Sequence, residues 1–289
     1  MNGIILVDKP QGFTSHDVVA KLRGILHERR IGHSGTLDPM ATGLLVVFVG
    51  RATRAVAFAE NHEKEYVASL RTGITTDTLD ITGEILARCD RSVTAEELTS
   101  ILPEFLGEQQ QLPPMYSAIK VDGKKLCDLA RKGVEVERRP RTIQIRELEY
   151  LGKDDGDFRL RVVCSKGTYI RTLADDIGTR LGTGAVLSAL RRTRAGAFSI
   201  VEAHTLAEIQ SYADRGEAES LLRPVDSLFS SLTALTLNKA QEKKCRVGAD
   251  FAFAAADGEY RVYAPDGGFL MLGRVENGRM RTVKSFFEV

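Results

Sequence analysis

The sequence has almost no net charge. Its 40 Lys and Arg residues nearly balance 39 Asp and Glu residues, which leaves a formal net charge of +1 at pH 7. A uniformly basic nucleic-acid-binding protein is therefore excluded, although a protein with one basic face is not. Apolar residues make up 43% of the chain and charged residues 27%. These values are typical of globular domains and argue against a wholly disordered chain.

Long apolar runs and paired cysteines are also missing. The longest apolar run, residues 44–49, is far shorter than the roughly 20 residues of a membrane-spanning helix. The first apolar residues soon meet Asp8 and Lys9, unlike a signal peptide. The four cysteines lie far apart without a CxxC pair, so we expect neither a zinc site nor a disulfide framework. We expect a cytoplasmic protein without a membrane segment.

Strand and helix patterns interleave along most of the chain. Apolar runs and alternation predict strands at residues 4–7, 44–49, 142–150 and 157–164, the second of them buried on both faces. A helix is expected after Ser15, whose side chain can act as its N-cap. The regular rhythm of a doubly wound parallel sheet is absent, so we predict an α+β fold for residues 1–230.

The pattern of expected secondary structure changes near residue 230. Short β-rich pieces separated by Gly, Asp and Asn turns follow an acidic stretch at 202–226. Such a pattern indicates a small, mostly β module. We therefore predict a second domain at 231–289.

Basic residues gather in three places. Residues 120–146 hold nine Lys or Arg residues against four Asp or Glu residues, and smaller clusters lie at 191–194 and 29–33. Any one cluster is as often a solvated surface as a binding site. Three of them in a nearly neutral chain favour a polyanion on one face.

The segment GHSGTLDPMATGLL, residues 32–45, brings together one carboxylate, Asp38, one imidazole, His33, and three glycines. Elementary chemistry leaves two interpretations about equally open. Asp38 could satisfy backbone donors in an ordinary turn, or the loop could be functional, because glycine lets a ligand approach the backbone closely.

Five segments resemble motifs of the TruB family of tRNA pseudouridine-55 synthases, and they occur in the family order. In sequence order they are LVDKPQGFTS from residue 6, the 32–45 loop, KEY from residue 64, CSKGTYIRTL from residue 164 and LRRT from residue 190. The C-terminal part resembles, more weakly, a PUA module, which is an RNA-binding β-barrel.

The resemblance implies a pseudouridine-synthase fold, in which a mixed, mainly antiparallel sheet carries flanking helices and is followed by a small PUA-like β-barrel. It also implies an enzyme that isomerises uridine 55 in the T-loop of tRNA after base flipping. No cofactor, metal or guide RNA is expected. We expect the T-arm as the partner, no protein partner, and a monomer as the default state.

Three residues inherit the central roles from the resemblance. Asp38 is the expected nucleophile, which either traps an electron-poor carbon or stabilises a sugar intermediate. Arg171 is its expected carboxylate partner and opposes the rise in pKa that burial causes. Tyr66 is expected to stack on the base, and its hydroxyl could take the C2′ or C5 proton. The order of bond making and the proton acceptor stay open.

Other residues are expected to shape the pocket. Tyr169 lines the second wall and Leu190 the apolar floor. His33 fills the space vacated by flipped nucleotides and contacts their phosphate. Lys9 and Pro10 support the tyrosine wall from below, and Lys9 could pair with a carboxylate.

We expect the stretch from about 115 to 146 to be a basic RNA-binding insertion. The side chains expected on the RNA backbone are Lys124, Lys125, Arg131, Lys132, Arg191 and Arg192. The sequence also allows two other interpretations of the function. A non-catalytic tRNA-binding or tRNA-folding protein would need the basic clusters but not Asp38. A guide-RNA-dependent relative of the dyskerin type is disfavoured by the basic insertion and by the lack of a Lys-rich tail.

Overall fold

The computed structural model describes residues 1–289 except 61, 118, 122, 131, 135 and 288–289. Within that part, nine strands form one mixed sheet with the order β1-β3-β12-β4-β11-β10-β7, with β2 beside β3 and β13 beside β12. Strands β12 and β3 run parallel, and the other pairs run antiparallel. The strands are β1 (Gly3–Lys9), β2 (Ile31–Ser34), β3 (Thr42–Val49), β4 (Lys64–Thr72), β7 (Gly107–Gln111), β10 (Arg141–Asp154), β11 (Asp157–Cys164), β12 (Ala185–Ala195) and β13 (Phe198–Ser199).

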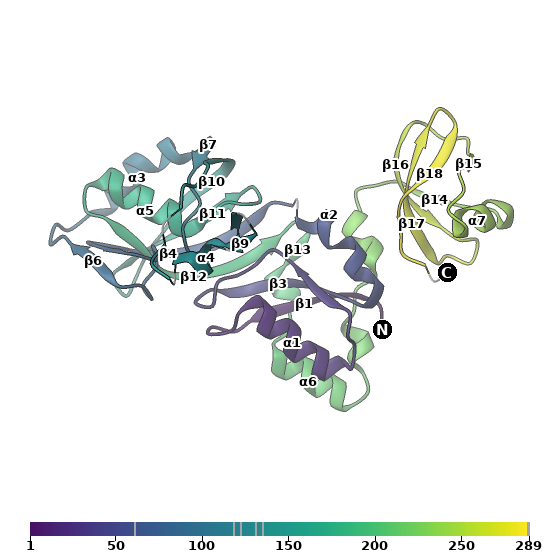
Figure 1. Ribbon diagram of the computed structural model, residues 1–289, viewed down its shortest axis with the longest axis horizontal. Helices are drawn as coiled ribbons and strands as arrows, with labels where there is room; N and C mark the ends of the chain where they lie inside the picture. Colours follow the sequence, from purple (N-terminus) through teal and green to yellow (C-terminus); the bar gives the residue numbers. More distant parts are fainter. Residues whose placement is uncertain (61, 118, 122, 131, 135, 288–289) are drawn as a thin grey trace.

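Helices cover the sheet in two groups (Figure 1). Helices α1 (Ser15–Leu26) and α6 (Leu206–Asp214) pack on β1 and β3, while α3 (Ala95–Ile101) and α5 (Ile170–Leu181) pack on the β12-β4-β11 half. Strand β3 is buried along nearly its whole length, as its continuous apolar run predicted. Its alternate residues enter two different cores, one under α1 and one on the opposite face.

Helix α1 begins differently from the sequence-based expectation. Its N-cap is Thr14, whose side chain accepts a hydrogen bond from the amide of Asp17 in a capping box. Ser15 is instead the first helical residue and is fully buried. Its Oγ accepts a 2.9 Å hydrogen bond from the amide of Leu37, so the helix start is tied to the loop that follows β2.

A curled five-stranded sheet with the order β14-β16-β17-β18-β15 forms the C-terminal part, seen in yellow-green in Figure 1. Its elements are β14 (Ala234–Thr236), α7 (Lys239–Arg246), β15 (Phe251–Ala252), β16 (Gly258–Tyr263), β17 (Phe269–Glu276) and β18 (Arg279–Ser285). The main sheet is mixed and carries flanking helices, and the curled sheet that follows is consistent with a PUA-like domain. This arrangement confirms the predicted fold class. The boundary at residue 230 stays a prediction.

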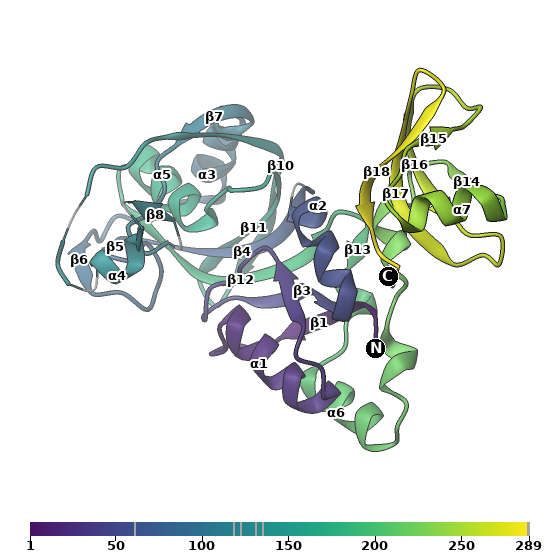
Figure 2. The same cartoon turned by 45° about the vertical axis from the view of Figure 1, so that its right-hand side comes forward.

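The C-terminal sheet lies beside the part of the main body that carries α2 (Val56–Glu60), as Figure 2 shows. Aromatic rings join the two parts. Phe58 of α2 meets Phe229 edge-on, with ring centroids 5.3 Å apart. Phe229 in turn contacts Phe269 and Phe286, which stack on each other at 5.3 Å. The two parts therefore share a buried aromatic core.

Small elements fill the predicted basic insertion. They are β8 (Lys120–Val121), β9 (Lys124–Lys125) and α4 (Leu126–Ala130). The last residues of the predicted stretch, 141–146, belong to β10 of the main sheet. A second hairpin, β5 (Ile74–Thr76) and β6 (Ile85–Arg88), lies earlier in the chain. No helix in the described part is long and apolar enough to cross a membrane.

Candidate active site

The loop that carries Asp38 connects β2 to β3, whose first residues pair with β12. Two glycines lie near the two ends of this loop. Gly35 has φ +80° and Gly43 has φ +98°, a region that side chains rarely adopt. A Cβ on Gly43 would also lie 2.3 Å from the carbonyl oxygen of Arg192 on the neighbouring strand. Backbone conformation and steric crowding therefore explain why glycine occupies these two positions.

Asp38 lies against Arg171, the second residue of α5. The Nε of Arg171 is 3.0 Å from Oδ2 of Asp38, and the arginine side chain is 6% exposed while the carboxylate is 35% exposed. The guanidinium also donates to the carbonyl oxygens of Thr78 at 3.1 Å and Tyr116 at 2.8 Å. A rigidly held cation thus fixes one side of a carboxylate whose other side is open.

Asp80 is a member of the site that the sequence did not reveal. Its Oδ2 lies 3.6 Å from Nη1 of Arg171, and its side chain is 6% exposed. Its Oδ1 accepts hydrogen bonds from the hydroxyls of Thr78 and Thr82. The only local signal is the alternation of polar residues at 78, 80 and 82, and it does not identify a partner on α5.

Burial is the main influence on the Asp38 carboxyl and raises its pKa. The charge of Arg171 acts most strongly against that rise, and Lys9 acts in the same direction, whereas Asp80 adds to it. The net effect is a raised pKa, and Arg171 is the strongest influence in favour of the ionised form. A carboxylate that is oriented by a cation in this way is suited to nucleophilic attack when it is ionised.

Tyr66 and Leu190 form an apolar wall beside this carboxylate. Tyr66 on β4 is 8% exposed and Leu190 on β12 is 7% exposed. Both belong to the same core cluster as Leu37 and Met40, which flank Asp38 in sequence. Burial raises the pKa of Tyr66, so its hydroxyl is protonated at neutral pH.

Tyr169 is the N-cap residue of α5, directly before Ile170. The side-chain amide of Gln111 holds its backbone, accepting from its N–H at 2.8 Å and donating to its carbonyl at 3.1 Å. Burial raises the pKa of its hydroxyl, and the charges of both Asp38 and Arg171 act on it. The structure therefore brings Asp38, Arg171, Tyr66, Tyr169 and Leu190 together.

Lys9 is fully buried at the end of β1. Its Nζ donates to the carbonyl oxygens of Pro10 at 2.9 Å and Phe13 at 2.6 Å. This differs from the expected pairing with a carboxylate, although the charge of Asp38 partly offsets the burial that lowers the pKa of Lys9 to about 8. Lys9 and Pro10 thus shape the turn that faces the Asp38 loop.

His33 lies on β2 and meets His16 of α1 edge-on, with ring centroids 5.5 Å apart. Its buried Nδ1 has no hydrogen-bond partner within the described part of the chain. Burial, followed by the influence of His16 and Arg192, lowers the pKa of His33 to about 4. The ring is therefore neutral at pH 7 and would meet a phosphate without a charge of its own.

Arg192 is not a surface residue, so its expected contact with the RNA backbone is wrong. Its side chain is 1% exposed. Successive residues of a strand point to opposite faces, and Arg191 takes the outward face, where it pairs with Asp8 through contacts of 2.7 and 3.1 Å. A cluster of adjacent arginines in a strand cannot all face one ligand.

The remaining expected RNA contacts lie in the insertion. Lys132 is exposed. Arg131 lies outside the described residues, as do the side chains of Lys124 and Lys125. Within the described part, no three His, Cys, Asp or Glu side chains gather where they could hold a metal ion.

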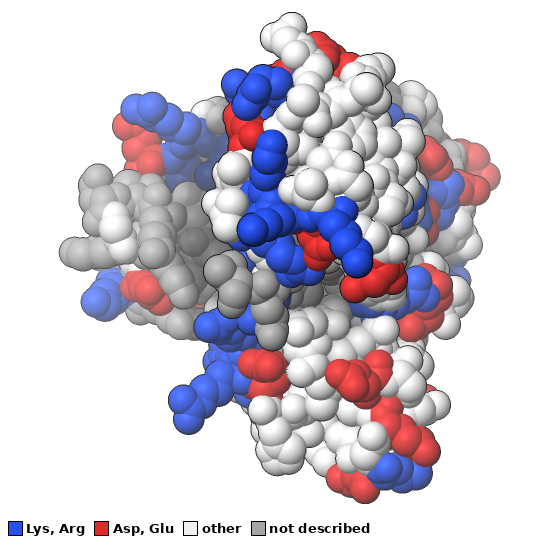
Figure 3. Space-filling model, turned by 90° about the vertical axis from the view of Figure 1, so that its right-hand side faces the viewer, with Lys and Arg blue, Asp and Glu red and all other residues white. Residues whose placement is uncertain are grey.

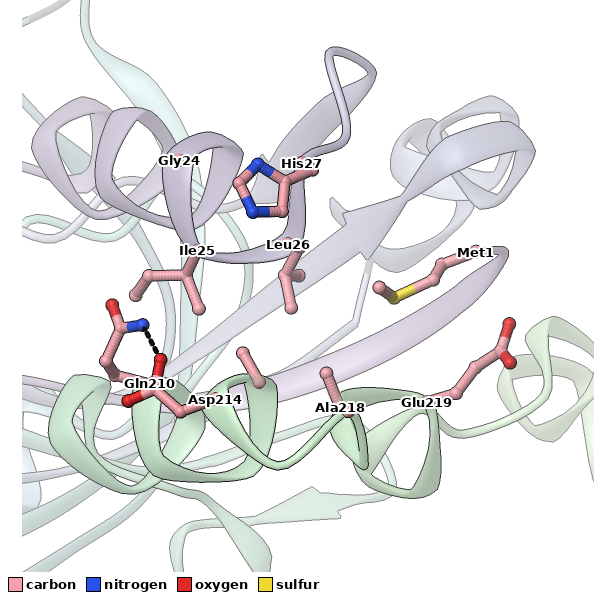
Figure 4. A pocket seen from close by; sticks show the side chains of 11 residues that line it. Met1, Gly24, Ile25, Leu26, His27, Gln210, Asp214, Ala218 and Glu219 are labelled. Atoms are coloured by element: carbon pink, nitrogen blue, oxygen red, sulfur yellow. Dashed lines mark hydrogen bonds between the residues drawn. The ribbon is translucent and has the colours of Figure 1, made fainter.

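A cavity of about 300 Å³ lies elsewhere, between α1 and α6 (Figure 4). Leu26 and His27 line one side, and Gln210 and Asp214 line the other, joined by a 2.7 Å hydrogen bond. None of the expected site residues lines it. It plays no part in the arrangement around Asp38.

Comparison with protein families identifies the class. Residues 23–170 match the family described as TruB family pseudouridylate synthase, N-terminal domain. Residues 171–230 match the tRNA pseudouridylate synthase B C-terminal domain. The chain belongs to the TruB family of pseudouridylate synthases, and it is an enzyme that isomerises uridine.

Individual relatives extend the likeness over almost the whole chain. A protein of Stutzerimonas stutzeri described as tRNA pseudouridine synthase B is 42% identical over 97% of this chain and 94% of its own length. A protein of Bacillus pumilus with the same description is 40% identical over 92% and 91%. Among solved structures, a chain of a Cbf5-Nop10-Gar1 complex superposes with a TM-score of 0.75 at 28% identity, over 99% of this chain and 85% of that one.

A second solved structure, an H/ACA RNP bound to a substrate RNA containing 2′-deoxyuridine, contains a chain with the same TM-score of 0.75. That chain is 26% identical to this one, over 99% of this chain and 85% of its own length. The likeness therefore includes the C-terminal curled sheet as well as the main body.

Proposed function

We propose that this enzyme converts uridine 55 in the T-loop of tRNA to pseudouridine, with Asp38 as the nucleophile and without a cofactor or a guide RNA. One observation carries the proposal. The Asp38–Arg171 ion pair lies beside an apolar wall of Tyr66 and Leu190, in a chain that is 42% identical to a tRNA pseudouridine synthase B.

The chemistry needs little beyond these groups. The N1–C1′ bond of the nucleotide breaks and a C5–C1′ bond forms, while C5 loses a proton and N1 gains one. The formula of the base is unchanged, so the balance requires no oxidant, reductant or phosphoryl donor. Asp38 either adds to the uracil ring or stabilises the sugar during the exchange, and both routes use an ionised carboxylate.

The target base must leave its stack to reach this carboxylate. Flipping costs a few kcal/mol, and stacking on an aromatic ring returns about 1–3 kcal/mol. Tyr66 and Tyr169 offer such rings, and Leu190 offers an apolar surface. Because burial raises the pKa of Tyr66, stacking is better supported for this residue than removal of a proton.

Charge on the surface is consistent with an RNA substrate. In Figure 3, Lys and Arg side chains gather in a band across the middle of the face, with acidic side chains beside them.

The relatives described as tRNA pseudouridine synthase B are 40–48% identical to this chain, whereas the chains of the ribonucleoprotein structures are 26–28% identical. We therefore favour a stand-alone enzyme over a guide-dependent subunit. A cytoplasmic monomer stays our expectation.

The test is to incubate the purified protein with an unmodified tRNA transcript in the presence of a chelator, without added cofactor or guide RNA, and to map pseudouridine along the product. We expect modification at position 55. A transcript with cytidine at 55 is the matched control and should stay unmodified. Tight binding of the transcript without product would favour the non-catalytic alternative and overturn the proposal.

A further inference from the structure

Arg192 is buried in the core, and the arrangement around Asp38 described above does not explain its presence there. It is 1% exposed, and no carboxylate within the described residues forms an ion pair with it. A buried guanidinium loses its hydration and is tolerated only when its donors find partners. The partners it does have are therefore informative.

Those partners lie on both sides of Asp38. The Nε of Arg192 donates to the carbonyl oxygen of Leu44 at 2.6 Å, and Nη2 donates to that of Gly35 at 3.0 Å. Gly35 precedes Asp38 in the loop, and Leu44 follows it on β3. One planar group thus holds the two ends of the catalytic loop.

The same residue lies next to Tyr66. In the sheet, Arg192 is paired with Gly43 on β3 and with Tyr66 on β4. Its charge and a side-chain hydrogen bond act on the Tyr66 hydroxyl, against the rise in pKa that burial causes. Arg192 therefore touches both parts between which a flipped base would lie.

We propose that Arg192 is a positioning residue of the isomerisation, whose buried guanidinium sets the Asp38 loop against the strand that carries Tyr66. This inference rests on the proposed function, since it assumes that Asp38 and Tyr66 flank the reacting uracil. A lysine in its place keeps a positive charge but lacks the fork that reaches two carbonyls at once. Misplacement of a catalytic group by about 1 Å can lower a rate by about a hundredfold.

The main test compares Arg192→Lys and Arg192→Met with the wild type on a tRNA transcript. Three quantities are measured: the single-turnover rate at saturating tRNA, the Kd for tRNA and the thermal midpoint. We expect the rate of Arg192→Lys to fall by about a hundredfold with Kd nearly unchanged, and Arg192→Met to be slower still. Ile177→Val, a fully buried change in α5, controls for reduced stability and should keep the wild-type rate.

A second variant tests the same contact from the loop. A Cβ on Gly35 would lie 3.3 Å from Nη1 of Arg192, so Gly35→Ala should displace the guanidinium and slow the chemical step. Gly156→Ala is the matched control, because Gly156 has nearly the same φ of +82° but nothing within 4 Å of its added Cβ. This pair decides the question if the Arg192 variants do not fold.

The outcomes separate the two proposals. A wild-type protein that makes no pseudouridine in tRNA contradicts the proposed function itself. An active wild type together with a folded Arg192→Lys enzyme that is equally fast at the chemical step overturns only the positioning role. If Kd rises while the single-turnover rate holds, Arg192 serves RNA binding and the proposal is also wrong.

Discussion

Oδ2 of Asp38 and Nε of Arg171 are 3.0 Å apart, and the arginine is by far the more deeply buried of the two. Backbone carbonyls of Thr78 and Tyr116 fix the guanidinium from the other side. The carboxylate is therefore held by a rigid partner and keeps an open face. This asymmetry is what a nucleophile needs, because the attacking group must be both oriented and accessible.

Replacing Asp38 by Asn should abolish turnover while tRNA binding is largely kept. The amide preserves size but cannot act as a nucleophile, and we expect a fall of at least about a thousandfold, or about 4 kcal/mol of activation free energy. Single-turnover assays and a binding titration measure the two effects. Asp154→Asn, at an exposed site in the β10–β11 hairpin, should behave as wild type. Rapid turnover by Asp38→Asn would refute the assignment.

Replacing Arg171 by Lys should lower kcat strongly with little effect on KM. Lysine keeps the charge but cannot contact Asp38 and two carbonyls in one plane, so we expect a loss of about a hundredfold from misplacement of the carboxylate. Arg180→Lys is the control on the same helix, since Arg180 is exposed and pairs with Glu104. Near-normal kcat in Arg171→Ala would mean that another group holds Asp38.

Replacing Asp80 by Asn should shift the acid limb of the pH–rate profile to lower pH. The charge of Asp80 contributes to the raised pKa of Asp38, so its removal lowers that pKa. Because the role proposed for Asp38 requires its ionised form, the variant should keep its activity further into acid, even if a loosened Arg171 lowers the plateau. Single-turnover rates between pH 4 and 8 measure this shift. With Asp90→Asn as an exposed control, an unmoved limb would exclude this coupling.

The sequence predicted the fold class and the loop around Asp38 because these depend on local patterns. The apolar run of β3 and the glycines at 35 and 43 are such patterns. Asp80 was missed because its contact with Arg171 joins a short hairpin to a distant helix. The error at Arg192 has a different cause. Charge clusters predict a surface, but a strand turns alternate residues inward.

His33 should stay neutral in the free protein until the pH falls to about 4, where its pKa is expected. The unfolded chain takes up this proton near pH 6.5, so the folded protein should lose stability as the pH falls from about 6.5 to 4. NMR titration of the imidazole signals, assigned with His33→Gln, measures the pKa. The variant should also show a weaker loss of stability over that range. A midpoint near 6.5 would mean that the ring is hydrated and could carry a charge to a phosphate.

The basic insertion should act through phosphates. Neutralising Lys124, Lys125, Arg131 and Lys132 to Gln should weaken tRNA binding and flatten its salt dependence. Phosphate contacts position an RNA without reading its bases. The slope of log K against log salt should become shallower by about 0.7 to 0.9 for each phosphate that the variant no longer neutralises. The lower value holds for single strands and the higher value for duplex DNA.

Titrations at several salt concentrations, paired with single-turnover rates at saturating tRNA, measure both effects. The rates should change far less than the affinity, because Asp38, Tyr66 and Arg171 are untouched. The control makes the same change of charge at four exposed residues outside the clusters, namely Lys21, Arg88, Lys153 and Arg215. If the insertion variant and this control have the same unaltered slope, the insertion is only a solvated surface. The contact with RNA would then fall to Arg29, Arg30 and the outward-facing Arg191, while Arg192 stays excluded by its burial.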